Sequence, residues 1–383
     1  MDEQLNTRLM AWVSFFNDPL WDFLVVFLVV VGVFYTLLTG AVQIRLFLHS
    51  IRVMKGSRKE GDDQHGITPF QAFVTGLASR VGVGNVAGVA IAIAIGGPGA
   101  VFWMWFTAFL GMSSAFVESS LAQLFKVRDH QNQQFRGGPA YYITQGLKQK
   151  WLGVVFALSL ILAYGFVFNA VQANSIVDAT AHAWGWDRAN VMLDLGGLGF
   201  EVSWVGVVLV IMTAAIIFGG IKRIAVVAER MVPLMAVLYL AVALYIAIIN
   251  FSILPDIFKL IFTEAFKFDA AAGGFFGAMV SMAMMQGIKR GLFSNEAGMG
   301  SAPNAAAASD VKHPVDQGLV QMLGVFVDTF VVCSCTAIII LASGLYHEAG
   351  FEGVTLTQMA LVSQIGSWGD DFLALILFLF AYS

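Results

Sequence analysis

Long runs of apolar residues constrain this chain more than any other feature. About 20 apolar residues in a helix span a ~30 Å hydrocarbon core, and runs of this length recur along most of the sequence. The composition agrees, because only 12% of the residues are charged, against about 25% in soluble domains. Outer-membrane barrels have alternating segments of about 10 residues instead. The pattern therefore predicts an all-α polytopic membrane protein.

The apolar runs define eight full spans and the beginning of a ninth. They cover residues 21–44, 69–95, 100–124, 152–175, 203–220, 232–251, 273–299 and 318–341, with the ninth beginning near residue 371. Two amphipathic segments, 255–267 and 355–366, are expected to be outer lids or interface helices or, equally, ordinary packed loops. The ninth run covers only about 18 Å as a helix, so we expect the chain to be incomplete at its C-terminus.

Lysine and arginine are concentrated on one side of the predicted membrane. With the N-terminus outside, the inner connections 45–67, 125–150, 221–231 and 289–316 carry sixteen basic residues, and the outer segments carry four. Cytoplasmic loops of membrane proteins carry such an excess. The sequence therefore predicts a multi-pass protein with its N-terminus outside the cytoplasm.

Several other classes of protein are disfavoured. The net charge is −4 and no basic tract suggests a nucleic-acid partner. Cys333 and Cys335 are one residue apart in an apolar run, a spacing that argues against a disulfide or a zinc site. No metalloprotease motif or nucleophile cluster indicates an enzyme. We expect no enzymatic activity, no cofactor and no obligate protein partner.

Span two is interrupted by the segment ASRVGVGNVAG at residues 78–88. Closely spaced glycines favour local unwinding, and unwound backbone at membrane depth must be satisfied by protein, water or ligand. Free NH groups at such a break can hold a carboxylate, while released carbonyls and the Asn85 side chain can hold a cation. Close helix packing through small residues explains the same spacing equally well.

Span seven carries a second glycine-rich pattern. GGFFG at 273–277 opens it, MMQGIKRG at 284–291 interrupts it, and the segment 292–301 follows. Paired interrupted helices in two halves indicate a transporter site. Spans two and seven are five apart and run in opposite directions, which predicts a five-plus-five inverted repeat. The predicted single domain, 1–383, then comprises a leading helix at 21–44, a first repeat at 69–251 and a truncated second repeat at 273–383.

A few polar side chains lie inside the predicted spans, where they are costly and often functional. Asp328 is expected either to act in ion coupling or to pair with Arg80. Glu118 is expected to be a packing or interface residue. Asn169 and Gln172 share a helix face and either line the substrate cavity or hydrogen-bond between helices.

Several phrases together resemble the alanine/glycine:cation symporter family, also called the sodium:alanine symporters, from about residue 20 to the end of the chain. The most specific is GGPGAVFWMW at 96–105. The others are FRGGPAYY at 135–142, VQAN at 171–174, FSNEAGMGS at 293–301, HPV at 313–315 and GVFVDT at 324–329.

The resemblance implies a leucine-transporter-like fold and a role in a bacterial inner membrane. It implies uptake of alanine, glycine or D-alanine with Na+ by alternating access, and the alternative is H+ coupling of the same uptake. Amides of Val83 and Gly84 would bind the substrate carboxylate. Carbonyls of Arg80 and Val81, with the Asn85 side chain, would face Na+. The ammonium end would meet the backbone around Met282, Met285, Gln286 and Gly287.

Two departures from the family pattern stand out. Val83 occupies a position where the family commonly has Thr or Ser, so one hydroxyl is missing beside the expected carboxylate site. Family members also continue for about three helices beyond Ser383, and their ninth span lines the pocket. Besides the transported amino acid and Na+, the lipid bilayer is the expected partner.

Overall fold

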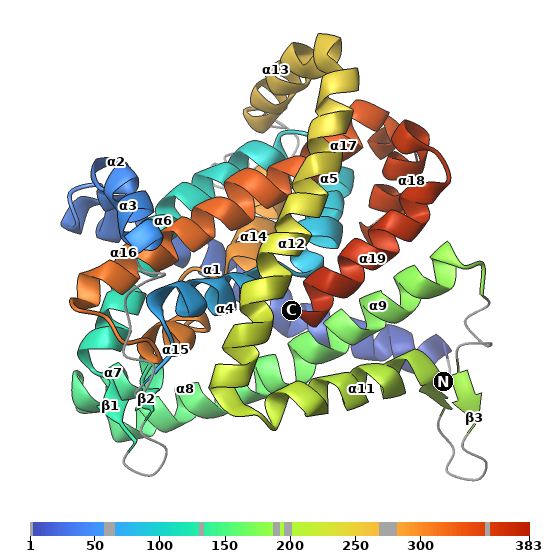
Figure 1. The fold of residues 1–383 in the computed structure, drawn as a ribbon. Helices are drawn as coiled ribbons and strands as arrows, with labels where there is room; N and C mark the ends of the chain where they lie inside the picture. The colour runs from blue at the N-terminus through green and yellow to red at the C-terminus, as the bar shows by residue number, and fades with distance from the viewer. Residues whose placement is uncertain are drawn as a thin grey trace.

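The computed structural model describes residues 3–56, 66–129, 134–186, 192–194, 201–267, 282–348 and 353–383. Most of these residues are helical (Figure 1). The first half contains α1 (Glu3–Leu38), α2 (Val42–Arg45), α3 (Phe47–Gly56), α4 (Pro69–Arg80), η1 (Gly84–Gly88), α5 (Val89–Gly96), α6 (Ala100–Leu124), α7 (Pro139–Gln145), α8 (Lys150–Leu162), η2 (Ala163–Phe168), α9 (Asn169–Ala183), α11 (Trp204–Ile217) and α12 (Gly220–Ile249).

The second half is built from shorter helices around the same core. It contains η3 (Phe251–Ile253), α13 (Leu254–Ala265), α14 (Met282–Asn295), α15 (Ala302–Ala307), α16 (Pro314–Val325), η5 (Phe326–Cys333), α17 (Ser334–Ser343), η6 (Leu345–His347), α18 (Gly353–Ile365) and α19 (Trp368–Tyr382). Two short antiparallel pairs complete the described chain: β1 (Val127–Arg128) with β2 (Phe135–Arg136), and β3 (Met192–Asp194) with β4 (Glu201–Ser203).

The prediction of an all-α membrane protein is confirmed. Among the described residues, 5 helices are long and apolar enough to cross a membrane, or up to 6 when the bent pair of α4 with η1–α5 is counted as one. The five are 7–38, 100–124, 150–183, 220–249 and 314–343. Span 203–220 corresponds to the shorter helix α11, and the beginning of span 273–299, with its GGFFG phrase, lies outside the described residues.

One predicted connection, 221–231, is helical in the structure. Gly220, with a φ of +71°, opens α12 directly after α11. Lys222 and Arg223 therefore lie in the first turn of a long helix. The prediction was wrong because charge alone does not stop a helix; the chain turns at the glycine pair that precedes the charges.

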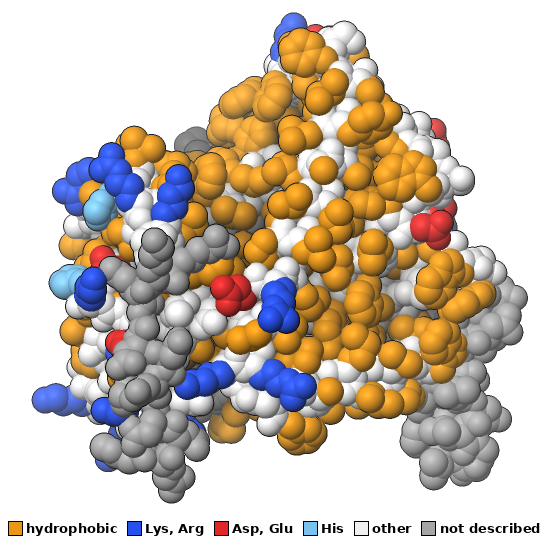
Figure 2. Space-filling model, viewed as in Figure 1, with side chains coloured by type: hydrophobic (Ala, Val, Ile, Leu, Met, Phe, Trp, Pro, Cys, Tyr) orange, Lys and Arg blue, Asp and Glu red, His pale blue; other side chains and the backbone are white. Residues whose placement is uncertain are grey.

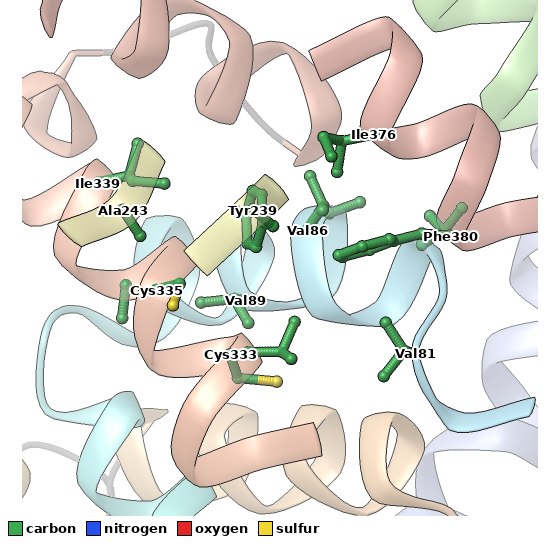
Figure 3. Close-up of a cluster of buried hydrophobic side chains, with 14 of the residues drawn as sticks. Val81, Val86, Val89, Tyr239, Ala243, Cys333, Cys335, Ile339, Ile376 and Phe380 are labelled. Atoms are coloured by element: carbon green, nitrogen blue, oxygen red, sulfur yellow. The ribbon is translucent and has the colours of Figure 1, made fainter. Parts of the chain in front are cut away.

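The buried core surrounds the broken helix. Figure 3 shows three valines of this helix, Val81, Val86 and Val89, within the core. Around them lie Tyr239 of α12, Cys333 of η5 and Phe380 of α19. Helix α6 packs against both α14 and α16. By contrast, α1 is largely exposed and contacts mainly α6 and α14. Helix α1 therefore lies at the periphery of the described chain.

The two predicted amphipathic segments are both helices. In α13, the carbonyl of Ala265 accepts a hydrogen bond from Nε1 of Trp103 at 2.9 Å, so this helix is anchored on the beginning of α6. In α18, Leu356 and Leu361 are fully buried. Helix α18 packs on η1, α17 and α19 rather than lying on the surface, so it forms part of the core near the break.

Helix α14 continues through the segment 284–291 without interruption. A Cβ on Gly287 would lie 2.3 Å from the carbonyl oxygen of Ala100, and one on Gly291 would lie 2.4 Å from the hydroxyl of Thr107. These glycines let α14 approach α6 closely. The prediction of a break here was wrong, because glycine spacing in a membrane helix fits close packing as well as unwinding.

Candidate functional site

The predicted break in span two is confirmed. Helix α4 begins at a capping box formed by Thr68 and Gln71 and ends at Arg80. Val81 is extended, and the pieces on either side of the break are bent by 52°. The extended residues leave backbone NH and carbonyl groups without helical partners, and these groups must be satisfied elsewhere.

Two side-chain amides satisfy the NH groups at the break. The NH of Gly82 donates to Oδ1 of Asn85 at 2.8 Å, and the NH of Val83 donates to Oε1 of Gln172 at 3.1 Å. Gln172 comes from α9, a different element. Its carboxamide oxygen occupies the position at which the resemblance implies a substrate carboxylate.

Hydroxyl groups lie against the carbonyls at and after the break. The hydroxyl of Ser383 lies 2.9 Å from the carbonyl oxygen of Phe380, 3.2 Å from that of Ala78 and 3.3 Å from that of Val81, and its single hydrogen cannot satisfy all three. The carbonyl of Asn85 accepts from the Thr336 hydroxyl at 2.7 Å. The carbonyls of Ala78 and Val81 therefore converge on one oxygen atom, an arrangement that suits a small cation.

Asn85 and Asp328 form the polar centre of the site. Nδ2 of Asn85 donates to Oδ1 of Asp328 at 2.6 Å. The other carboxylate oxygen accepts from the hydroxyls of Ser294 at 2.9 Å and Thr329 at 2.8 Å. Asn85, Asp328 and Thr329 are fully buried. Three neutral donors thus surround this buried carboxyl group, and a bound cation would be the natural counter-ion of its ionised form.

Arg80 is buried but does not pair with Asp328. Its Nε donates to the carbonyl of Asn295 at 3.0 Å, and its Nη1 donates to Oε1 of Gln321 at 3.1 Å. Within the described part of the chain, no carboxylate oxygen lies within 4.0 Å of its guanidinium. The alternative of an Arg80–Asp328 ion pair is therefore wrong. Arg80 instead ties the end of α4 to α14 and α16.

A second break lies at 296–301, between α14 and α15. Glu296, Gly298 and Gly300 all have positive φ values, of 54°, 84° and 82°. The NH of Gly298 donates to Oε1 of Glu118 at 3.3 Å. Glu118 thus holds this irregular backbone, which goes beyond the packing role expected for it.

The second break is also linked directly to the first. Oε2 of Glu296 accepts hydrogen bonds from the hydroxyls of Ser79 and Ser301, and Glu296 is buried. Ser79 is the penultimate residue of α4. The irregular segment 296–301 is therefore tied to the end of α4, whereas the break predicted at 284–291 of span seven is absent.

The predicted residues of α14 are not brought to the break. A Cβ on Gly96, at the far end of α5, would lie 3.0 Å from Cβ of Gln286 and 3.2 Å from the carbonyl oxygen of Met282. Met285 packs beside α1 with Val25, and Gly287 packs on α6. The α14 residues next to Gly84 are Phe293 and Ser294: a Cβ on Gly84 would lie 3.3 Å from Cδ1 of Phe293 and 3.6 Å from Cα of Ser294. Gln286 is two turns, about 10 Å, away along the helix.

Asn169 is likewise separated from the break, although it shares a helix with Gln172. Its side chain is exposed and its Nδ2 donates to the carbonyl of Gly165 at 3.2 Å. The structure therefore brings together Arg80, Val81, Val83, Gly84, Asn85, Gln172 and Asp328. It does not bring Asn169, Met282, Met285, Gln286 or Gly287 to them.

Aromatic side chains cover the break. The ring of Phe293, next to Gly84, stacks on Phe168 at 5.2 Å, and Phe168 stacks on Tyr164 at 4.6 Å. Phe168 and Tyr164 belong to the π-helical segment η2. The break contains the π-helical segment η1, and Asp328 lies in a third, η5.

Three π-helical turns thus border one site, and π-turns are frequent at functional sites. Sequence reasoning missed them because a π-turn has no distinct hydropathy period. It also missed Ser294, Glu296 and Thr336, although the FSNEAGMGS phrase at 293–301 is a usable signal.

Comparison with known proteins identifies the family of the chain. A model of the sodium:alanine symporter family matches residues 6–383. An uncharacterised transporter of Haemophilus influenzae is 58% identical over 98% of this chain and 75% of its own length. A probable sodium/glutamine symporter of Bacillus subtilis, GlnT, is 47% identical, covering 96% of this chain and 72% of its own. A putative sodium/proton-dependent alanine carrier of the same species, YrbD, is 42% identical over 97% and 75%.

Proposed function

Because the chain belongs to the sodium:alanine symporter family, we propose that it is a secondary active symporter that moves a small neutral amino acid inward with Na+. The observation that carries this proposal is the broken helix of α4 and η1–α5, whose Asn85 contacts the buried Asp328 and whose Ser79 contacts Glu296 in the irregular segment 296–301. Irregular backbone at membrane depth is tolerated where it lines a binding site.

The amides at the first break are the proposed carboxylate site. The NH of Val83 holds a carboxamide oxygen of Gln172, and a substrate carboxylate oxygen presents the same acceptor with a full negative charge. Charge-assisted hydrogen bonds are about twice as strong as neutral ones. The substrate can therefore displace Gln172 from this amide, with the NH of Gly84 as the second donor.

The sodium ion is proposed to bind at the carbonyl end of the same break. The Val81 carbonyl, and that of Arg80 beside it, end the inner half-helix. Asn85 and Asp328 supply amide and carboxylate oxygens nearby. Oxygen donors of this kind suit hard cations. Substrate and ion would thus share one broken helix, which gives a physical basis for coupling them in alternating access.

The size of the substrate follows from the aromatic cover. Phe293 lies within van der Waals distance of Gly84, and Phe168 supports it. This crowding favours alanine, glycine or D-alanine. Glutamine belongs in any substrate test as well, because the relative GlnT is named for it.

Coupling to H+ is the second candidate, and one observation favours it. Three buried carboxyl groups, those of Glu118, Glu296 and Asp328, lie near the break, with Arg80 as the buried cation between them. An excess of buried acids is relieved by binding either Na+ or a proton. The relative YrbD is named as sodium/proton-dependent.

Uptake by the intact protein in liposomes tests the proposal. We expect labelled alanine, glycine, D-alanine or glutamine to accumulate when an inward Na+ gradient is imposed at equal pH on both sides. Accumulation driven by a pH gradient without Na+ would select the proton-coupled alternative. Equilibration that ignores both gradients would contradict symport of either kind.

A further inference from the structure

Helices α2 and α3 carry a basic face that nothing in the transport site uses. Arg45, His49, Arg52 and Lys55 are exposed there, together with the apolar side chain of Leu48. Leu48, Arg52 and Lys55 are four and three residues apart, so they share one face of α3. Figure 2 shows Lys and Arg side chains gathered over α2 and α3.

The cations of this face have no acidic partner among the described residues. Arg45 donates to the carbonyl of Thr39 at 3.0 Å, which leaves its charge uncompensated. No described carboxylate lies within 4.0 Å of Arg52 or Lys55. The neighbouring positions of α3 pack on the core through Phe47, Ile51, Val53 and Met54. The helix is therefore held in place and presents its charges outward.

An apolar cavity begins directly beside this basic face. It has a volume of about 310 Å³, and its lining includes Ile44 and Phe47 at the basic end. It continues between α6 and η5 along Phe326 and Phe330, whose rings stack at 5.3 Å. Phe326 and Phe330 lie within the span 314–343. The cavity therefore runs from the level of the cations into the membrane-spanning part of the molecule.

We propose that α2, α3 and this cavity bind one anionic phospholipid. The phosphate group would lie against Arg45, Arg52 and Lys55, and one acyl chain would enter the cavity past Ile44. Juxtamembrane Lys and Arg side chains attract anionic headgroups, and every such cation adds roughly the same binding free energy as the next. The cavity provides a place for the acyl chain. A soluble anion has no such chain and would leave the cavity empty. The site is separate from the broken helices and does not depend on the transport proposal.

Lipid binding to the purified intact protein tests this site. Delipidated protein in detergent is titrated with dioleoyl phosphatidylglycerol or dioleoyl phosphatidylcholine, and bound lipid is counted by native mass spectrometry. We expect one tightly bound phosphatidylglycerol, and weaker binding of phosphatidylcholine. The Arg52→Gln/Lys55→Gln variant should lower the affinity for phosphatidylglycerol by about fivefold for each removed cation, with little change for phosphatidylcholine.

Two further variants separate charge from chain. Ile44→Trp narrows the entrance of the cavity and keeps every cation, so it should weaken the binding of both lipids. Lys148→Asn/Lys150→Gln removes two exposed cations from the connection between α7 and α8 and should change neither. Should the double variant of α3 fail to fold, titration of the wild type in 0.5 M salt replaces it.

Three results would overturn the proposal. The first is that the wild type binds the two lipids with equal affinity. The second is that the preference for phosphatidylglycerol is unchanged in the Arg52/Lys55 variant or, in the replacement test, in 0.5 M salt, and the third is that the Lys148/Lys150 control loses as much affinity for phosphatidylglycerol as the Arg52/Lys55 variant. Retained binding in Ile44→Trp would show that the cavity does not hold a chain, and would overturn that part of the site.

Discussion

Asn85 illustrates how much of the site depends on single side chains. Its amide oxygen accepts from the NH of Gly82, while its amide nitrogen donates to Asp328. One carboxamide thus closes the broken backbone and orients the buried carboxylate. An ionised Asp has no donor and Ser has a single polar atom, whereas the Asn amide carries a donor and an acceptor on two separate atoms.

The charge of Asp328 is predicted to determine ion affinity. Asp328→Asn preserves the shape of the side chain and removes the negative charge that a bound Na+ would balance. We expect the Na+ concentration for half-maximal uptake to rise by at least about tenfold. Asp371→Asn, an exposed position in the first turn of α19, is the matched control. An unchanged Na+ dependence in Asp328→Asn would exclude this residue from the ion site.

Gln172 is predicted to compete with the substrate for the NH of Val83. Gln172→Glu places a carboxylate at this amide, so substrate affinity should fall by about tenfold or more while Na+ binding is retained. Substrate and Na+ binding can be measured separately by scintillation proximity with labelled ligands. Asn169→Asp, one turn away and exposed, should behave as wild type. Equal substrate affinity in both variants would place the carboxylate site elsewhere.

Among the elements, the π-helical segments matter most for the site. η1, η2 and η5 each widen one turn and thereby turn side chains or carbonyls toward the break. The carbonyl of Asn85 in η1 accepts a hydrogen bond from the Thr336 hydroxyl of α17. A regular α-helix would keep this carbonyl within its own ladder.

The contact between α14 and α6 is predicted to depend on Gly287. A methyl group there would meet the carbonyl oxygen of Ala100 at 2.3 Å, which requires the helices to separate. We expect Gly287→Ala to destabilise the protein by about 1–3 kcal/mol, seen as a lower melting temperature in detergent. Gly88→Ala is the control, because a Cβ there meets nothing within 4 Å. Equal melting temperatures would show that the two helices do not pack as closely as described.

For the whole molecule, the orientation in the membrane remains a prediction from the distribution of Lys and Arg. Both native cysteines are buried, so single exposed cysteines can report it. We expect Thr263→Cys, on α13, to react with a membrane-impermeant maleimide in intact cells. Lys150→Cys, at the first residue of α8, should react only after the membrane is opened. The reverse pattern would place the N-terminus inside.

The sequence by itself determined the class of the protein and the place of one break. Hydropathy reports the cost of leaving backbone and charge in hydrocarbon, so the membrane class was predictable, and the glycines of 78–88 predicted the break. The family phrases determined the function expected of it. The span count and the connection at 221–231 were less predictable, because hydropathy does not report where a helix begins.

Only the tertiary structure decided which residues meet. Glycines at 287 and 291 and glycines at 82 and 84 both occur inside apolar runs, yet the first pair packs against α6, whereas the helix is broken beside the second. The difference lies in what each glycine touches, which is a property of the neighbouring helix. For the same reason the hydrogen-bond partners of Arg80 and Asp328 could not be predicted from the sequence. They depend on how α14, α16 and η5 pack. Buried charges are satisfied by whichever donors and acceptors the packing of other elements brings near them.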